Sequence, residues 1–125
     1  MNVRIRALAL TAFVLCGLAV AIAAVDITGK WTAAFDTQIG EQKYTYEFQV
    51  KGSQLTGTAA SENGTSEIKN GKVSGDTVTF DEFLNFQGMP LEISYTGKIV
   101  SEDQIDFTRK VADIATEKLV AKRVK

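Results

Sequence analysis

The sequence predicts an all-β protein, an eight-stranded antiparallel up-and-down (meander) barrel in which each strand pairs with its neighbour in the chain. Three observations predict this fold. Apolar and polar residues alternate along most of the chain, as they do in strands with one buried face. Short turn sequences separate these segments at hairpin spacing. All connections are short, and closing such a meander into a barrel removes the two exposed edges of an open sheet.

The chain begins with features of a secretory signal peptide. Arg4 and Arg6 give it a basic start, and the stretch from Ala7 to Val20 is almost wholly apolar. Small alanines follow, so cleavage is expected after Ala23 or Ala24. We therefore expect a secreted or periplasmic protein without a stable membrane anchor after cleavage.

Two alternatives for this leader, residues 1–24, stay open. The first is a retained membrane anchor, for which the apolar stretch is short and lacks a charged stop. The second is a lipoprotein signal at Cys16, where the preceding Leu15 is bulkier than the small residue that such signals carry.

The remaining part, residues 25–125, is expected to form a single domain. All acidic side chains lie in this part, whereas Arg4 and Arg6 are lost with the leader, so its net charge is near −3. No basic patch indicates a nucleic-acid or anionic-membrane partner. The one cysteine lies in the leader, so the domain depends on its core rather than on a disulfide.

The first two strands show the clearest alternation. Trp31 and Phe35 share one face of the strand expected at Ile27–Phe35. A turn at Gln38–Glu41 leads into a second strand, Tyr44–Val50, in which aromatic or apolar residues alternate with polar ones.

The third strand is expected at Leu55–Ala59, after a turn at Lys51–Gln54. The next turn, Ser61–Gly64, contains Asn-Gly, which is the strongest short hairpin signal. The fourth strand, Thr65–Val73, is the weakest by pattern because it holds only two apolar residues.

Four further strands complete the predicted barrel. They are expected at Val78–Phe80, Leu91–Gly97, Ile105–Arg109 and Leu119–Val124. Ser74–Asp76 and Ser101–Gln104 are compact polar turns, whereas Phe86–Pro90 is expected to break the chain and Val111–Glu117 to be a longer connection.

Two internal glycines, Gly57 and Gly97, fall on inward phases of their strands, where they relieve crowding inside a tightly curved barrel. A two-sheet sandwich is the alternative fold. It usually requires long crossing connections, which the pattern of turns does not provide.

The turns of a meander alternate between the two ends of the barrel. The turns at 51–54, 74–76 and 101–104 are compact and polar and are expected to close one end. The opposite end carries the turns at 38–41, 61–64, 86–90 and 111–117, of which two are longer or more apolar than a turn requires. Binding usually occurs at such variable loops.

Trp31 at the start of the first strand and Arg123 near the end of the last are expected at the closed end. Gly29-Lys30-Trp31 together with Arg123 resembles the closed end of the calycin barrels (lipocalins, avidins and fatty-acid-binding proteins). The resemblance implies a structural pair in which the guanidinium packs across the indole and reaches nearby carbonyls.

The segments Ile27–Thr32 and Leu55–Thr58 also resemble the opening of avidin-type proteins. The later tryptophans that line an avidin biotin site are missing, so biotin binding is not implied. The chain from Val25 onward is more similar to small exported bacterial proteins of unassigned function, through "Gly-Lys-Trp-Thr", "Leu-Thr-Gly-Thr", "Gly-Lys-Val-x-Gly-Asp" and a terminal "Ala-Lys-Arg". That resemblance implies fold and export only.

No cofactor, metal or enzymatic activity is expected. Without histidine, or cysteine after the leader, zinc, copper and iron–sulfur sites lose their usual ligands. Asp81-Glu82 and Glu102-Asp103 with Asp106 are the only candidates for calcium, and solvated turns explain them as well. Nucleophile–base pairs and phosphate loops are also missing. A two-carboxylate glycosidase stays open by composition alone, but the acids fall mostly on outward phases or turns.

Candidate ligand-binding residues gather at the loop-rich end. The apolar run from Phe80 to Leu91 exceeds what a strand and a turn need. The candidate residues are Phe35, Tyr44, Tyr46, Phe83, Leu84, Phe86 and Met89. These side chains either line a pocket or plug the mouth, since small barrels can be filled by their own side chains.

Our first functional hypothesis is a secreted, non-enzymatic binding module that holds an apolar or amphiphilic small molecule at the loop-rich end. The second is a protein-interaction module, such as an envelope-located inhibitor or accessory domain, that engages another exported protein through its loops or the Val25–Thr28 segment. A carbohydrate-binding module is less favoured, because the outward phases carry mostly Thr, Lys, Glu and Ser rather than aromatic residues.

Overall fold

Strands joined by short turns make up residues 25–125, the part of the chain that the computed structural model describes. The predicted signal peptide, Cys16 and the expected cleavage sites lie outside these residues. The strands are β1 Gly29–Thr37, β2 Gly40–Lys51, β3 Gln54–Ser61, β4 Gly64–Glu67, β5 Lys69–Ser74, β6 Thr77–Phe86, β7 Met89–Ser101, β8 Gln104–Val111 and β9 Ala115–Arg123. Across residues 25–125, no helix is long and apolar enough to cross a membrane.

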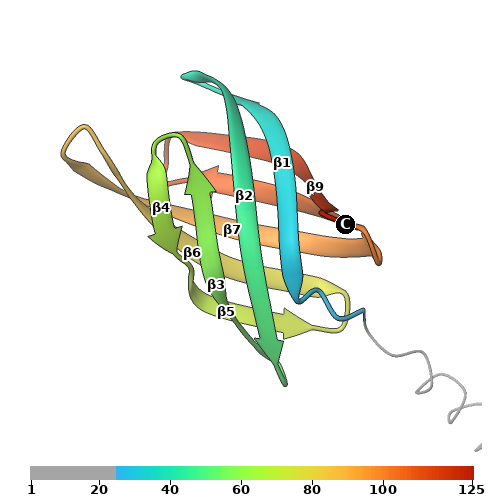
Figure 1. Cartoon of the computed structure of the whole chain (residues 1–125). Coiled ribbons are helices and arrows are strands. Elements are labelled where there is room, and N and C mark those ends of the chain that lie inside the picture. Colours follow the sequence, from blue (N-terminus) through green and yellow to red (C-terminus); the bar gives the residue numbers. More distant parts are fainter. Residues whose placement is uncertain (1–24) are drawn as a thin grey trace, which may run out of the picture.

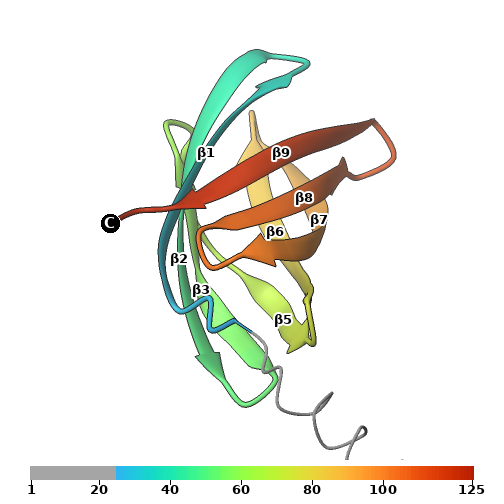
Figure 2. The same ribbon diagram turned by 90° about the vertical axis from the view of Figure 1, so that its right-hand side faces the viewer.

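The strands form one closed antiparallel barrel, as predicted. Each strand except β4 pairs with the next in the chain, and β1 pairs with β9 to close the ring (Figures 1 and 2). β3 pairs with both β4 and β5, which together take the fourth of eight positions around the barrel. The predicted eight-stranded meander is therefore confirmed for the described residues.

The predicted fourth strand, Thr65–Val73, is interrupted. The chain leaves the sheet at Ile68, whose side chain is buried and whose N–H donates to the Gly57 carbonyl at 3.0 Å. Asn70 then takes a positive φ of 54°, and the pairing of β5 with β6 is irregular between Lys69 and Lys72. This segment has few apolar side chains to bury, so it does not form one continuous strand. The buried side chain of Ile68 holds it against the core between β4 and β5.

The predicted break at Phe86–Pro90 is wrong. β6 and β7 form one long hairpin whose tip projects from the barrel, with only Gln87 and Gly88 outside the strands (Figure 1). Both have positive φ, 53° and 80°, which matches the twist of a two-residue hairpin turn. Pro90 fits in β7 because β8 pairs with β7 only from Ile93 onward, so no ladder bond toward β8 is lost there.

The last strand also begins earlier than predicted. β9 starts at Ala115 rather than Leu119, and the connection from β8 shrinks to Ala112–Ile114. Ala112 has a positive φ of 46°, and the Ile114 N–H donates to the Val111 carbonyl at 2.9 Å. The additional strand residues alternate between half-buried and exposed, so their weak apolar pattern did not reveal the strand.

The core fills the barrel with side chains of inward phase. Phe48 and Phe107 have ring centroids 6.5 Å apart, and Phe80 lies 5.7 Å from Phe107. A Cβ added at Gly97 would lie 2.4 Å from the Phe107 ring, so this glycine makes room for the aromatic side chain. Gly57 has the same role against main chain, because its Cβ would lie 1.8 Å from the Glu47 carbonyl oxygen.

Candidate functional site

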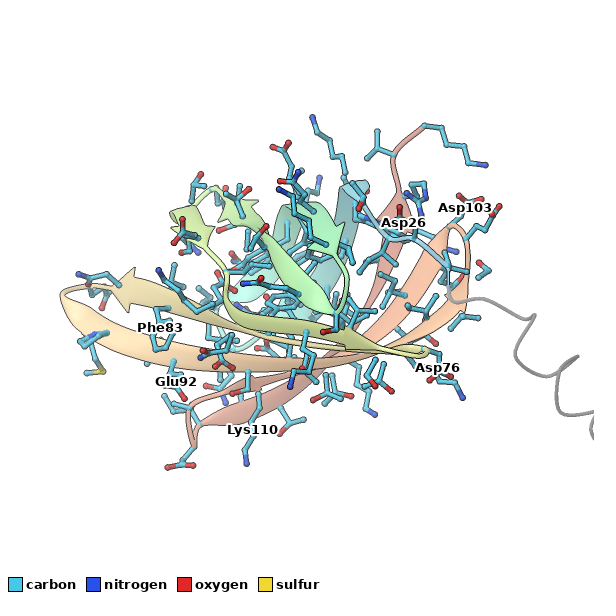
Figure 3. The ribbon with its side chains drawn as sticks, turned by 90° about the horizontal axis from the view of Figure 1, so that it is seen from below. Asp26, Asp76, Phe83, Glu92, Asp103 and Lys110 are labelled. Atoms are coloured by element: carbon cyan, nitrogen blue, oxygen red, sulfur yellow. The ribbon has the colours of Figure 1, made fainter. Side chains whose placement is uncertain are left out.

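The two ends of the barrel differ in how they are built. Figure 3 shows Asp76 and Asp103 in the turns at one end, and Phe83, Glu92 and Lys110 on strands toward the opposite end. The first end also holds the start of β1 and the end of β9. We call it the closed end and the opposite one the open end.

Arg123 and Trp31 cover the closed end. The Arg123 Cζ lies 4.6 Å from the centroid of the Trp31 ring, and Trp31 is fully buried. The guanidinium donates to three main-chain carbonyls, those of Glu102 at 2.8 Å, Thr28 at 3.0 Å and Asp26 at 2.9 Å. One planar fork thus joins both chain ends of the barrel and the β7–β8 turn.

The open end holds a cavity of about 150 Å³. All four turns or hairpins of this end contribute to its wall. Its apolar lining comes from Ile39, Leu84, Leu91, Ile93, Val111, Ile114 and Ala115. Its polar lining comes from Thr37, Gln38, Gln42, Tyr44, Asn63, Arg109 and Glu117.

A buried polar layer forms the floor of this cavity. Glu82, which is 1% exposed, points inward from β6 and accepts hydrogen bonds from the Tyr44 hydroxyl at 3.0 Å and the Tyr95 hydroxyl at 2.8 Å. Arg109 of β8 donates to the same two hydroxyl oxygens, at 2.9 and 2.8 Å. The Tyr46 hydroxyl lies 3.0 Å from that of Tyr95 and links the layer to the core below.

Arg109 connects this layer to the mouth. Its Nη1 donates to Glu117 Oε1 of β9 at 2.5 Å, and its Nη2 lies 3.6 Å from Glu82 Oε1. Its Cζ lies 5.1 Å from the Tyr44 ring and 5.3 Å from the Phe35 ring. Arg109 therefore lies between the carboxyl groups of Glu82 and Glu117.

Burial keeps the tyrosines of this layer protonated. It raises the pKa of Tyr44 to about 12, and the negative charge of Glu82 adds to the effect. The pKa values of Tyr46 and Tyr95 are raised further, again mainly by burial. The Tyr44 and Tyr95 hydroxyl groups therefore stay hydrogen-bond donors toward Glu82 over the whole physiological range.

The predicted ligand-binding residues divide into three groups. Tyr44 and Leu84 line the cavity. Phe35 and Tyr46 do not line it but stack on either side of Tyr44, with ring centroids 5.6 and 5.4 Å away. Phe83 and Met89 are 47% and 60% exposed and do not line the cavity. The side chain of Phe86 lies outside the described residues.

Phe83 points outward because β6 continues to Phe86, beyond the predicted strand end at Phe80. Glu82 and Leu84 then share the inward phase, and Phe83 between them takes the outer face. Met89 lies in the same hairpin, directly after the two-residue turn.

Glu82 and Arg109 were missed as site residues. Both follow the inward phase of their strands, Glu82 after Phe80 and Arg109 after Phe107. One acidic and one basic residue on inward phases would have indicated a buried pair. The prediction that the acids lie mostly on outward phases or in turns is wrong for Glu82.

Of the candidate calcium ligands, Glu82 belongs to the buried polar layer, whereas Asp81 and Asp103 lie apart from it. Asp81 accepts a hydrogen bond from Asn70 at 2.9 Å, and Asp103 lies at the closed end, 3.0 Å from Lys125. Within residues 25–125, no three histidine, cysteine or acidic side chains gather closely enough to hold a metal ion.

Comparisons with protein-family models, curated proteins and solved structures found no match to this chain. The candidate site therefore rests on its own geometry.

Proposed function

We propose that the protein is a non-enzymatic binding module and that the open end of its barrel holds a small amphiphilic molecule. The observation that carries the proposal is a cavity at the open end with an apolar wall and a polar floor, lined by residues of all four hairpins of that end. Concave apolar sites with a few convergent polar groups are typical of small-molecule binding.

The size of the cavity restricts the ligand. A volume of about 150 Å³ equals that of an engineered apolar cavity that accepts benzene. The inserted part is therefore a single ring or a short alkyl chain, and a larger ligand leaves its remainder at the rim between Ile39 and Ile114. A long acyl chain does not fit without rearrangement of the core.

Charge restricts the polar group of the ligand. Glu82 and Glu117 surround the single guanidinium of Arg109, and each of its three nitrogens already donates a hydrogen bond. An anionic group in the cavity meets the Glu117 carboxylate and a guanidinium whose three nitrogens already donate hydrogen bonds, whereas Glu82 lies beneath the lining. A cationic amine or a neutral hydrogen-bond donor finds acceptors there, so we propose that the ligand carries such a group.

We propose that the protein is exported and that residues 1–24 are removed near Ala23 or Ala24. We also propose that the barrel is calycin-like. The leader composition and the Trp31–Arg123 contact support these points.

The first experiment is a native mass spectrum of the protein exported by its own host, compared with its denatured mass. Extra mass that is lost on denaturation identifies a resident ligand. If the native mass equals that of the cleaved chain alone, the protein does not hold a ligand tightly. Binding is then tested with added small molecules.

Three probes that share one ring then test the charge preference: benzylamine, benzyl alcohol and benzoate. We expect benzylamine and benzyl alcohol to shift the NMR methyl signals of Leu84, Ile93 and Val111, and benzoate to bind at least about tenfold more weakly. Leu84→Trp fills the cavity and should abolish these shifts, whereas Asn85→Trp, on the exposed face of the same strand, should retain them. Equal binding of benzylamine to both variants contradicts the proposed site.

A further inference from the structure

The seam between β1 and β9 is closed by very few residue pairs. Only Trp31 with Arg123 and Thr32 with Lys122 are paired, although both strands continue toward the open end. Elsewhere around the barrel, β1 pairs with β2 along its whole length and β8 pairs with β9 from Gln104 to Val111. In Figure 2, β1 and β9 meet near the C-terminus and then diverge.

The direction of the unused main-chain groups follows from the pairing at the closed end. The Val124 N–H donates to the Lys30 carbonyl at 2.8 Å, so Lys30 directs its main-chain groups toward β9. Because main-chain groups alternate between the two edges of a strand, those of Ala34 and Asp36 also point toward β9. By the same alternation, those of Val120 and Lys118 point toward β1.

A groove lies where these groups face each other. It has a volume of about 580 Å³ and is lined by Ala34, Phe35 and Asp36 of β1, Lys118, Leu119 and Val120 of β9, and Asp106, Phe107 and Thr108 of β8. Continuing the observed register would pair Ala34 with Val120 and Asp36 with Lys118, which are four of the lining residues. The groove therefore occupies the place of the missing ladder.

A second groove, of about 370 Å³, continues toward the open end between Asp36–Gln38 and Ala115–Glu117. Ala34, Asp36, Lys118 and Val120 all have exposed side chains, so this edge is accessible from solvent.

We propose that the β1–β9 seam binds an extended segment of another polypeptide by strand addition. Only a peptide main chain presents alternating donors and acceptors at the spacing of the free groups on β1 and β9. Two exposed strand edges that face each other are the usual template for such pairing.

The lining predicts the pattern of the bound segment. Phe35, Leu119 and Phe107 present apolar surface at the base of the groove, whereas Asp36 and Lys118 flank its outer side with opposite charges. The segment therefore alternates apolar residues toward the barrel with polar residues toward solvent. Insertion beyond Thr32 and Lys122 moves the open-end parts of β1 and β9 to about 10 Å apart, twice the usual spacing. The two residue pairs and the Arg123 hydrogen bonds to Thr28 and Asp26 hold the strands together at the closed end.

The test uses the exported full-length barrel and a synthetic peptide with the sequence of β9, Ala115–Arg123, which can pair with β1 in a known register. Residue-resolved amide hydrogen exchange is measured with and without the peptide. We expect fast exchange at Ala34 and Asp36 in the free protein and at least about tenfold slower exchange with the peptide.

The control is the same peptide with N-methyl groups on alternate amides, which keeps every side chain but removes half of the main-chain donors. We expect no protection from it. Equal protection by both peptides, or slow exchange at Ala34 and Asp36 before any peptide is added, overturns the proposal. Concentration-dependent protection without peptide overturns it in favour of self-association.

A matched pair of variants tests the same point in the protein. Ala34→Pro removes one N–H that faces the seam, and we expect binding of the unmodified peptide to weaken at least about fivefold. Ala34→Val keeps the N–H and the exposed position and should bind as the parent does. Benzylamine binding at the open-end cavity should survive in both variants, so failure of this proposal is distinct from failure of the proposed function.

Discussion

The interior of the barrel has two halves that differ in chemistry. Toward the closed end, Tyr46, Phe48, Phe80 and Phe107 pack ring against ring, with neighbouring centroids 5.6 to 6.5 Å apart. Toward the open end, the inward positions carry Glu82, Arg109 and the hydroxyl groups of Tyr44 and Tyr95, and a cavity lies above them.

The difference shows that a small barrel can be filled by its own side chains and still keep a pocket. The aromatic half excludes solvent and supplies the core. The polar layer ends that core and leaves the mouth open. Among the described side chains, no buried polar atom lacks a hydrogen-bond partner, so the layer is satisfied without a ligand. Five predictions test the contrast between the halves.

The largest effect is expected from breaking the buried ion pair. Arg109→Met leaves Glu82 buried without its cation, which should cost about 3–5 kcal/mol of unfolding free energy. The double variant Glu82→Leu with Arg109→Met should be more stable than Arg109→Met alone, because it removes both charges. Urea unfolding measures each value. Glu82→Leu alone completes the set. If the loss of unfolding free energy in the double variant equals the sum of the losses in the two single variants, coupling across the layer is contradicted.

The second effect is a loss of stability at alkaline pH. The pKa of Tyr44 is about 12 in the folded protein and 10.0 as its ordinary value, so the folded chain keeps a proton that the unfolded chain loses. Stability is therefore fully present below pH 10 and falls as the pH rises through 12, by about 2–3 kcal/mol for this residue.

Tyrosinate absorbance checks this directly. All three tyrosines of the chain belong to the layer, so little tyrosinate should appear near pH 10.5 in the folded protein. Urea at the same pH should release it. Ordinary titration of the folded protein around pH 10 would show that water enters the layer.

The third prediction concerns the aromatic half. Gly97→Ala places a Cβ against the Phe107 ring and should cost about 1–3 kcal/mol. Adding Phe107→Leu should recover part of that loss, since the smaller side chain leaves space. Unfolding midpoints in urea compare the three chains, and no recovery in the double variant would exclude overpacking as the cause.

The fourth prediction concerns the closed end. Arg123→Lys keeps the charge but loses the planar fork that reaches the carbonyls of Glu102, Thr28 and Asp26. We expect a loss of about 1–2 kcal/mol in urea unfolding. Binding of benzylamine at the far end should not change, and a weakened affinity would show that the two ends are coupled.

The smallest effect is expected at Phe83, on the outer face of β6. Phe83→Ser should change the unfolding free energy by no more than about 0.5 kcal/mol and leave benzylamine binding intact. Leu84→Ser, one residue later and facing the cavity, should weaken that binding. A loss of binding in Phe83→Ser would instead restore Phe83 to the ligand site.

The sequence by itself determined the barrel of residues 25–125. Period-two alternation in Trp31–Phe35 and Tyr44–Val50, together with turn signals such as Asn63-Gly64, is local information, and strands and hairpins are local structures. It failed where the local pattern was weak or mixed. The predicted strand ends at Phe80, although β6 continues through the apolar run to Phe86.

Only the tertiary structure decided the site. Glu82 and Arg109 lie on β6 and β8, separated by β7, and the barrel brings them to the same two tyrosine hydroxyls. Whether an inward charge is satisfied depends on partners across the barrel, which no local pattern specifies. The divergence of β1 from β9 is likewise a property of ring closure, because the two strands stand at opposite ends of the chain and their pairing depends on the curvature of all the others.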